Sequence, residues 1–377
     1  MNFEEFAAKP LLETGGVAVP RSELVASAAE ASGAAKRIGP CVVKAQVPTG
    51  KRGKAGGIQL ATTPEDAATH AANILGMEIG GHRVERLLIE AQVPIDKELY
   101  AAVLNDPVSC GPVLLFSPLG GMDVEEAAEQ DPNAMRRLEI DISTNLEMDD
   151  VFPLLRDLDL AGQEAAIAET LVALYGVYRS RDAELLEVNP LVLTKDKRVV
   201  ALDCKLTVCD SSIERQEDIA SNGSPDPLTD LEAEAAAAGL KYIELGGSVG
   251  VLANGAGLTM TTMDAITHYG GSPSNFLEIG GEAYTKSETA LRILLKNPNI
   301  KSLLVNFCGA FARTDVMAGG VVEAWKAIRP DIPVFFTIHG TGEDEAVALV
   351  KDQLGIEPFD LMDDAVKAAV AAASEVA

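Results

Sequence analysis

The sequence has few histidines and cysteines, and none of them lies at a spacing typical of a metal site. Its 377 residues include only four histidines and five cysteines. The cysteines are Cys41, Cys110, Cys204, Cys209 and Cys308, with no C-x-x-C pair among them, and the histidines form no H-x-x-x-H pair. These absences argue against a zinc site and a disulfide framework, and they favour a reducing cytoplasm as the location.

Long apolar runs and an excess of basic residues are absent as well. No apolar run approaches the roughly 20 residues that are needed to span a bilayer. Residues 1–6 carry acids where a targeting peptide has Arg or Lys, so we expect a soluble, cytoplasmic protein with no membrane partner. The chain has 57 acidic and 31 basic residues and a net charge of -26, which argues against a nucleic-acid partner.

The chain is too long for one ordinary core, and 47% of it is apolar, so we expect about two or three domains. Strand patterns in the first part of the chain lie at 41–46, 86–92, 99–104, 113–117, 184–193 and 199–206. A polar connector at 211–239 follows. Beyond it, strand patterns at 249–253, 302–307 and 334–338 alternate with helical patterns at 259–268, 286–296 and 363–377. This alternation predicts an α/β domain with a parallel sheet.

The most informative segment of the chain is residues 42–57. A β-branched run carries Lys44 and ends in a loop with Lys51, Arg52 and Lys54. The same loop contains Gly50, Gly53, Gly56 and Gly57. Glycines let a backbone approach phosphate oxygens closely, and the cations reverse the sign of charge locally in an acidic chain. We interpret the segment as a phosphate-binding loop, with a flexible, solvated basic loop as the alternative.

A second candidate site is the hairpin predicted at residues 184–206. With its turn centred on Asp196, the residues opposed on one face are Asn189 with Asp203 and Glu187 with Lys205. Amide and carboxylate oxygens, completed by water and phosphate, are the ligands that Mg²⁺ prefers. The alternative is a half-exposed hairpin whose charges face water, but a neighbouring phosphate-binding loop favours a Mg-nucleotide site.

Six segments carry a resemblance to a known family, in one order along the chain. They are residues 43–46, 53–57, 96–100, 187–191, 202–203 and 254–258. Together they resemble the β subunit of succinyl-CoA synthetase, and the resemblance covers nearly the whole chain. It implies an ATP-grasp domain in residues 1–235, with a smaller subdomain at roughly 20–90. A flavodoxin-like CoA-ligase domain in residues 240–377 is expected to follow.

The resemblance also implies roles for individual residues of the first domain. The expected phosphate-binding residues are Lys44, Lys51, Arg52, Gly53 and Lys54. Glu90 and the backbone near Val93 are expected to contact the base, and Glu98 the ribose. Asn189 and Asp203 are expected to bind Mg²⁺. Pro20 is the residue that adenine-preferring members carry, so the nucleotide is expected to be ATP.

The implied reaction converts ATP, a short-chain carboxylic acid and CoA to ADP, phosphate and an acyl-CoA. It proceeds through a phosphohistidine on a partner α subunit, in an αβ or α2β2 assembly, with succinate as the default acid. Glu187 corresponds to the carboxylate that orients the phosphohistidine, although it can also be a structural partner of Lys205. Gly280 and Gly281 open the helix that faces the phosphohistidine, and Glu282 replaces the third family glycine there.

The expected acid-binding region departs from the family pattern. The substrate-binding residues that correspond are Asn254, Gly309, Ala310, Phe311 and Ala312. Ala310 replaces a glycine, and Phe311 is bulkier than usual. Thr337 replaces an arginine, and His339 is gained. These departures indicate either another acid, such as malate, or drift in a packing loop.

Two other functions remain open at this point. An ATP-grasp carboxylate-amine ligase uses the same Mg-ATP apparatus, but the second βα domain with the motif at 254–257 argues against it. A non-catalytic scaffold subunit is conceivable because of Glu282 and Thr337.

Overall fold

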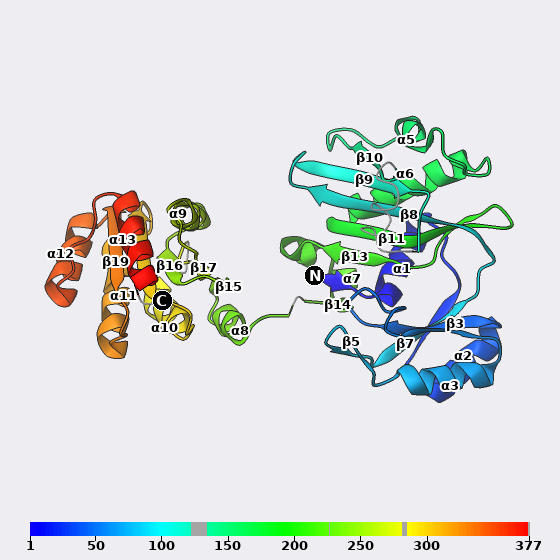
Figure 1. The fold of residues 1–377 in the computed structure, drawn as a ribbon, viewed down its shortest axis with the longest axis horizontal. Coiled ribbons are helices and arrows are strands. Elements are labelled where there is room, and N and C mark those ends of the chain that lie inside the picture. Colours follow the sequence, from blue (N-terminus) through cyan, green and yellow to red (C-terminus); the bar gives the residue numbers. More distant parts are fainter. Residues whose placement is uncertain (122–133, 226, 281–284, 376–377) are drawn as a thin grey trace. The chain divides into compact units, whose positions relative to one another are not determined.

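The computed structural model describes residues 1–121, 134–225, 227–280 and 285–375. They form two compact units, Met1–Asp226 and Pro227–Ala377 (Figure 1). Each unit has its own sheets and its own buried apolar clusters. None of the described helices is both long and apolar enough to cross a membrane.

The larger sheet of the first unit is antiparallel, with the order β10-β9-β8-β11-β13-β1-β14 and β12 paired to β11. Its strands are β1 (Asn2–Phe3), β8 (Ile95–Asp106), β9 (Gly111–Ser117), β10 (Arg136–Glu139), β11 (Ala183–Thr194), β12 (Val199–Ala201), β13 (Lys205–Val208) and β14 (Gly223–Ser224). The helical segments are α1 (Glu5–Thr14), α5 (Met148–Leu155), α6 (Glu164–Ser180), the 3-10 helix η1 (Asp210–Arg215) and α7 (Glu217–Ala220).

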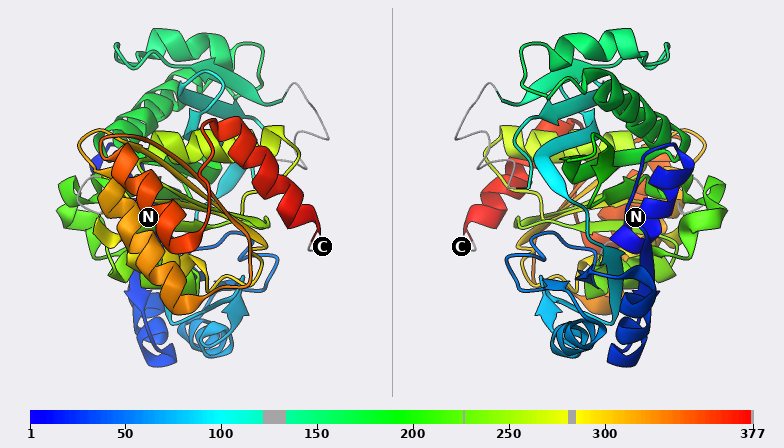
Figure 2. Two further views of the ribbon diagram at one scale, coloured as in Figure 1. Left: turned by 90° about the vertical axis from the view of Figure 1, so that its left-hand side faces the viewer. Right: turned by 90° about the vertical axis from the view of Figure 1, so that its right-hand side faces the viewer.

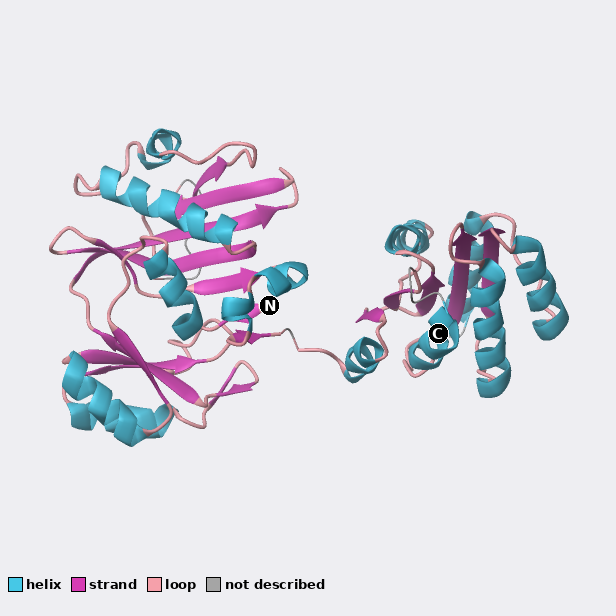
Figure 3. Cartoon of the chain, turned by 180° about the vertical axis from the view of Figure 1, so that it is seen from behind, coloured by secondary structure: helices cyan, strands magenta, loops and turns pink. Residues whose placement is uncertain are grey.

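One face of this sheet packs on α6, which lies across its strands (Figure 3). Alternate residues of β8, namely Leu99, Ala101 and Val103, point into the shared core, while Tyr100 and Ala102 between them are buried on the opposite face of the sheet. Helix α6 buries residues at helical spacing, including Ile167 and Leu171, against them.

The smaller sheet of the first unit has the order β2-β7-β3-β4 and is antiparallel throughout. Its strands are β2 (Ser22–Val25), β3 (Cys41–Gln46), β4 (Ile58–Ala61) and β7 (Arg86–Ala91). Helices α2 (Ala28–Ile38) and α3 (Pro64–Ile74) pack together, and a small hairpin of β5 (Glu78–Ile79) and β6 (His82–Arg83) precedes β7. Ser27 and Thr63 cap the two helices by accepting hydrogen bonds from backbone N–H groups of the first turn.

The predicted pairing of Glu187 with Lys205 is confirmed, whereas Asp203, the predicted partner of Asn189, lies between two strands. Leu191 pairs with Ala201 and Glu187 pairs with Lys205, which is the register of a turn centred on Asp196. The predicted strand at 199–206 is interrupted, however, and forms β12 and β13. The backbone between these strands bonds to side chains, because the Leu202 carbonyl accepts hydrogen bonds from two lysines and the Cys204 N–H donates to Asp203 Oδ1 at 2.8 Å.

The second unit is built on one five-stranded sheet with the order β15-β17-β16-β18-β19. Its strands are β15 (Lys241–Glu244), β16 (Val249–Ala253), β17 (Asn275–Glu278), β18 (Ser302–Gly309) and β19 (Val334–Gly340). Its helices are α8 (Asp230–Ala237), α9 (Ala256–His268), α10 (Ser287–Leu294), α11 (Thr314–Ile328), α12 (Glu343–Leu354) and α13 (Met362–Glu375). Helices α9 and α13 share one core with the sheet, while α10, α11 and α12 share another, so both faces are covered (Figure 2).

Two features of the second unit differ from the predicted parallel-sheet domain of residues 240–377. Four strands run parallel, as predicted, but the edge strand β15 pairs antiparallel with β17. The short link from β15 to β16 makes these two strands run in opposite directions, because a parallel arrangement would need a longer crossover, and β17 lies between them and runs parallel to β16. Helix α8 packs on β15 and α10, with Ala235 buried among their side chains. The structural division therefore falls before α8, earlier along the chain than the predicted boundary.

Candidate nucleotide site

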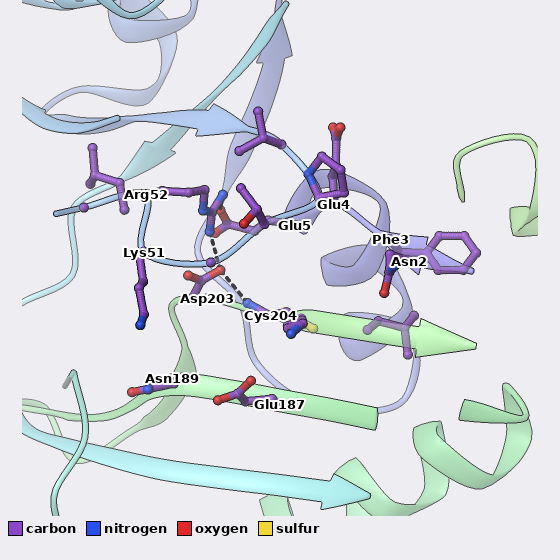
Figure 4. Close-up of a pocket in the computed structure, with 18 of the residues that line it drawn as sticks. Asn2, Phe3, Glu4, Glu5, Lys51, Arg52, Glu187, Asn189, Asp203 and Cys204 are labelled. Atoms are coloured by element: carbon purple, nitrogen blue, oxygen red, sulfur yellow. Dashed lines mark hydrogen bonds and ion pairs between the residues drawn. The ribbon is translucent and has the colours of Figure 1, made fainter. Parts of the chain in front are cut away.

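The first unit contains a cavity of about 540 Å³ between the basic loop and the hairpin. Its walls come from residues 2–5, 47–54 and 203–206, together with Ile58, Gly121, Glu187, Asn189 and Pro190 (Figure 4). The predicted residues that line it are Lys51, Arg52, Gly53, Lys54, Glu187, Asn189 and Asp203. The structure thus brings together the two candidate sites that lie far apart in the sequence.

Arg52 links the loop to the hairpin. One guanidinium nitrogen donates hydrogen bonds to Glu5 Oε2 and to the Ala45 carbonyl, both at 2.9 Å, and the other donates to Asp203 Oδ1 at 2.6 Å. Burial alone would lower the pKa of Arg52, but Asp203 and Glu5 raise it above its usual value. Arg52 is therefore a permanent cation between two carboxylates of the cavity wall.

Lys44 and Glu90 lie together in a buried cluster behind this wall. The Lys44 ammonium is 2.8 Å from Glu5 Oε1, 2.6 Å from Glu90 Oε1 and 2.5 Å from the Leu202 carbonyl oxygen. Burial alone would lower the pKa of Lys44, but Glu5 and Glu90 raise it above its usual value of 10.5. Neither Lys44 nor Glu90 is among the described residues that line the cavity.

Glu5 is the centre of the cluster, and the sequence analysis did not single it out. Its carboxylate contacts Lys9, Lys44 and Arg52, and its side chain lines the cavity. Burial would raise the pKa of Glu5, but Lys44, Lys9 and Arg52 together hold it well below its usual value of 4.5. The helical spacing of Glu5 and Lys9 in α1 is an ordinary surface pattern, so nothing local predicts their burial.

Asn189 and Asp203 lie on the two arms of the hairpin and line the same cavity. Their side-chain oxygens are ligands of the kind that Mg²⁺ prefers. Asn189 Oδ1 accepts a hydrogen bond from the Gly121 N–H at 2.8 Å, and Asp203 Oδ1 accepts one from Arg52. Among the described residues there is no group of three or more His, Cys, Asp or Glu side chains that could hold a metal. A metal at this pair would thus need water or phosphate oxygens as its other ligands.

Glu187 and Lys205 are cross-strand neighbours that both line the cavity. The Tyr100 hydroxyl on β8 is a further partner of Glu187 that the sequence analysis missed. Burial, followed by the charge of Glu187 and a hydrogen bond to it, raises the pKa of Tyr100 above its usual value of 10. Tyr100 is 5% exposed, so it stays protonated and donates to Glu187.

The predicted base and ribose contacts lie outside the cavity lining. Val93 is half-buried in the link between β7 and β8. Glu98 is exposed on β8, and a Cβ atom at Gly121 would lie 1.8 Å from Glu98 Oε2. Glu98 therefore lies directly beside Gly121, at the margin of the cavity.

In the second unit, the predicted substrate-binding residues gather at the carboxyl ends of the parallel strands. Asn254 follows β16 and exchanges hydrogen bonds with the backbone of Cys308 on β18, at 2.7 and 2.8 Å. Gly309 ends β18, and the turn after it carries Ala310, Ala312 and Phe311, whose side chain is 86% exposed. Gly280 follows β17 at the same edge. Gly281 and Glu282 lie outside the described residues.

The two departures on β19 have different environments. Thr337 is fully buried, and its hydroxyl has no hydrogen-bond partner among the described residues. His339 lies at the surface, with Nε2 2.8 Å from the Asp360 carbonyl oxygen and Nδ1 3.4 Å from Glu343 Oε1. Only His339 is therefore placed to contact a molecule in solution.

Comparisons with known proteins agree with this architecture. The ATP-grasp domain family matches residues 2–193, and the CoA-ligase family matches residues 252–372, so the two domain types and their order are as predicted. The chain is similar to the β subunit of ADP-forming succinate–CoA ligase from Cupriavidus pinatubonensis, with 40% identity over 388 aligned positions and 99% of each chain covered. The corresponding subunit from Rubrobacter xylanophilus is 41% identical over 355 positions, with 93% of each chain covered.

A solved structure of ATP citrate lyase from Methanothrix soehngenii, in complex with citrate and coenzyme A, shares the fold. It has a TM-score of 0.66 and 22% identity, and the match covers 98% of this chain and 99% of that one. The two family matches and the near full-length identity to curated relatives agree with each other. The chain belongs to the family of ADP-forming succinate–CoA ligase β subunits.

Proposed function

We propose that this chain is the nucleotide-binding β subunit of a cytoplasmic, ADP-forming carboxylate–CoA ligase with succinate as its default acid. The observation that carries the proposal is the cavity in which the basic loop meets Glu187, Asn189 and Asp203. Relatives of nearly the same length that are named succinate–CoA ligase β subunits support the choice of reaction.

ATP is the proposed nucleotide. Its phosphates bind at Lys44, Lys51, Arg52, Gly53 and Lys54, and its base and ribose bind near Glu90, Val93 and Glu98. Asn189 and Asp203 would hold Mg²⁺, which offsets phosphate charge when it is bound. The position of Asn189 and Asp203 on facing parts of the hairpin supports this assignment.

The proposed partner is an α subunit that carries the phosphohistidine, in an αβ or α2β2 assembly. Glu187 is proposed to orient the histidine ring through its carboxylate. Its place in the cavity wall and the hydrogen bond from Tyr100 support that role, because a carboxylate that accepts a hydrogen bond from a buried hydroxyl is held in one orientation. Gly280 and Gly281 are proposed to face the same histidine.

The proposed acid and CoA steps belong to the second unit, at the turn of Gly309, Ala310, Phe311 and Ala312 beside Asn254. Backbone N–H groups at such a turn suit a carboxylate. The alternative substrate is malate or another short acid, because the acid-binding region departs from the family pattern at Phe311, Thr337 and His339. The match of residues 252–372 to the CoA-ligase family disfavours the carboxylate-amine ligase.

The test is reconstitution. We expect the purified chain to bind ADP in calorimetry but to form no thioester, and to produce acyl-CoA only when it is combined with an α subunit of its source organism. A panel of succinate, malate and other short acids then identifies the substrate. ATP-dependent acyl-CoA formation by the chain alone would contradict the division of labour, and an inactive complex across the panel would contradict the assigned reaction.

A further inference from the structure

Two buried lysines share three acceptor groups, which are the carboxylates of Glu5 and Glu90 and the carbonyl of Leu202. Lys9 on α1 is 2.6 Å from Glu5 Oε1 and 2.8 Å from the Leu202 carbonyl oxygen, and it also pairs with Glu90. Lys44 on β3 contacts the same Glu5 oxygen, the same carbonyl oxygen and the other oxygen of Glu90. Each lysine is no more than 7% exposed. Each group that accepts a hydrogen bond from Lys44 is thus also contacted by the ammonium of Lys9.

The cluster is electrically balanced. Its carboxylates are Glu5, Glu90 and Asp203, and its cations are Lys9, Lys44 and Arg52. Three negative charges therefore meet three positive charges. A buried charge that loses its partner is strongly destabilising, so this balance constrains any movement within the cluster.

This balance creates a difficulty for nucleotide binding through Lys44. A phosphate that takes the Lys44 ammonium must remove it from Glu5 and Glu90, which are each 2% exposed. Without another cation, Glu90 would be left as an unpaired buried carboxylate. Lys9 already contacts both glutamates, and its own position one helical turn from Glu5 on α1 keeps it there.

We propose that Lys9 is a positioning residue that keeps Glu5 and Glu90 paired while Lys44 moves to a nucleotide phosphate. The inference rests on the proposed nucleotide-binding function and adds a residue to it. Lys44 is the lysine that moves because its strand leads directly into the loop of the cavity, whereas Lys9 is held on a helix. Glu5, which both lysines contact, forms part of the cavity wall.

The test compares the affinities of the full-length chain for ADP and for adenosine, because only ADP carries phosphates. In Lys9→Met the two glutamates have one cluster lysine, Lys44, so we expect ADP to bind about tenfold more weakly or worse, with adenosine affinity within about twofold of the unmodified chain. The charge-balanced Lys9→Met/Glu90→Gln variant should recover most of the lost preference for ADP over adenosine, because no buried carboxylate at position 90 then loses its partner when Lys44 moves. Lys36→Met, at an exposed site on α2, removes the same charge and should change neither affinity.

Glu5→Gln alone provides a second measurement that does not depend on whether Lys9→Met folds. It loosens the hold on Lys44, so the preference for ADP over adenosine should rise. An unchanged or lower preference in Glu5→Gln overturns the inference, as does an equal loss of ADP and adenosine affinity in Lys9→Met. If the unmodified chain binds no ADP, the proposed function fails and the inference fails with it.

Discussion

Glu5 shows how a single buried carboxylate organises the candidate site. It is bonded to three cations from three segments of the chain, and its pKa is held well below 4.5 by them. Its folded-state pKa lies below that of the unfolded chain, so its stabilising contribution is complete above about pH 4.5 and is lost as the pH falls further. The charge state of this one residue therefore predicts that the first unit loses stability when the pH falls below about 4.5.

We therefore expect Glu5→Gln to lower the free energy of unfolding of the first unit by about 3 kcal/mol at pH 7, because it leaves three buried cations with only two carboxylates, Glu90 and Asp203. The variant should also lose less stability than the unmodified chain between pH 5 and pH 3. Urea unfolding followed by circular dichroism at several pH values measures both effects. Glu13→Gln, at an exposed position on the same helix, is the matched control and should change little. Parallel pH profiles of Glu5→Gln and the unmodified chain would contradict the assignment.

At the scale of elements, the loop after β9 approaches the backbone of β8 closely. A Cβ atom at Gly120 would lie 2.2 Å from the Leu99 carbonyl oxygen, which is main chain and cannot turn away. The next residue, Gly121, donates its N–H to Asn189 at 2.8 Å. The contact between β8 and this loop thus holds one of the proposed metal ligands in place.

We expect Gly120→Ala to destabilise the first unit by about 1 to 3 kcal/mol, because the added methyl group forces the loop off β8. The same shift moves the donor of Asn189, so the gain in ADP affinity on adding Mg²⁺ should shrink. Thermal unfolding and calorimetry with and without Mg²⁺ measure these effects.

Gly176→Ala is the control for Gly120→Ala. Gly176 is exposed within α6 with open space at its Cβ position, and its replacement should stabilise the helix by about 0.5 to 1 kcal/mol. A Gly120→Ala variant that keeps both its stability and its Mg²⁺ response would show that the loop does not position Asn189.

At the scale of the whole molecule, each described apolar cluster draws its residues from one unit. The first unit also contains the whole cavity with the proposed nucleotide and metal residues. The ends of the parallel strands, with the proposed acid-binding turn, belong to the second unit. Folding and nucleotide binding should therefore be separable.

We expect polypeptides of residues 1–226 and 227–377 each to unfold cooperatively when produced separately, because each retains its cores. The first should bind ADP with nearly the affinity of the full chain, and the second should not bind it. Circular dichroism and calorimetry on the two fragments test this. Loss of ADP binding by a folded 1–226 fragment would show that the second unit contributes to the nucleotide site.

The sequence by itself determined the parts of the protein that depend on local pattern. Apolar alternation located β3 and β16 to the residue, and it placed Glu187 opposite Lys205, since a period-two pattern around one turn allows a single register. It also identified the basic loop and the hairpin as parts of one site. The loop can be recognised from its glycines and lysines alone, because they lie within one short stretch of the sequence.

Only the tertiary structure decided which charges meet. Glu5 and Lys9 have the spacing of an ordinary surface ion pair on a helix. In the folded unit both are buried, and Glu5 contacts Lys44 and Arg52 while Lys9 contacts Glu90. The same holds for Tyr100 beside Glu187 and for Gly121 beside Asn189. Contacts between residues far apart in the chain leave no periodic trace in it, because they arise from the packing of complete sheets and helices. The balance of charge behind the cavity is therefore a property of the fold.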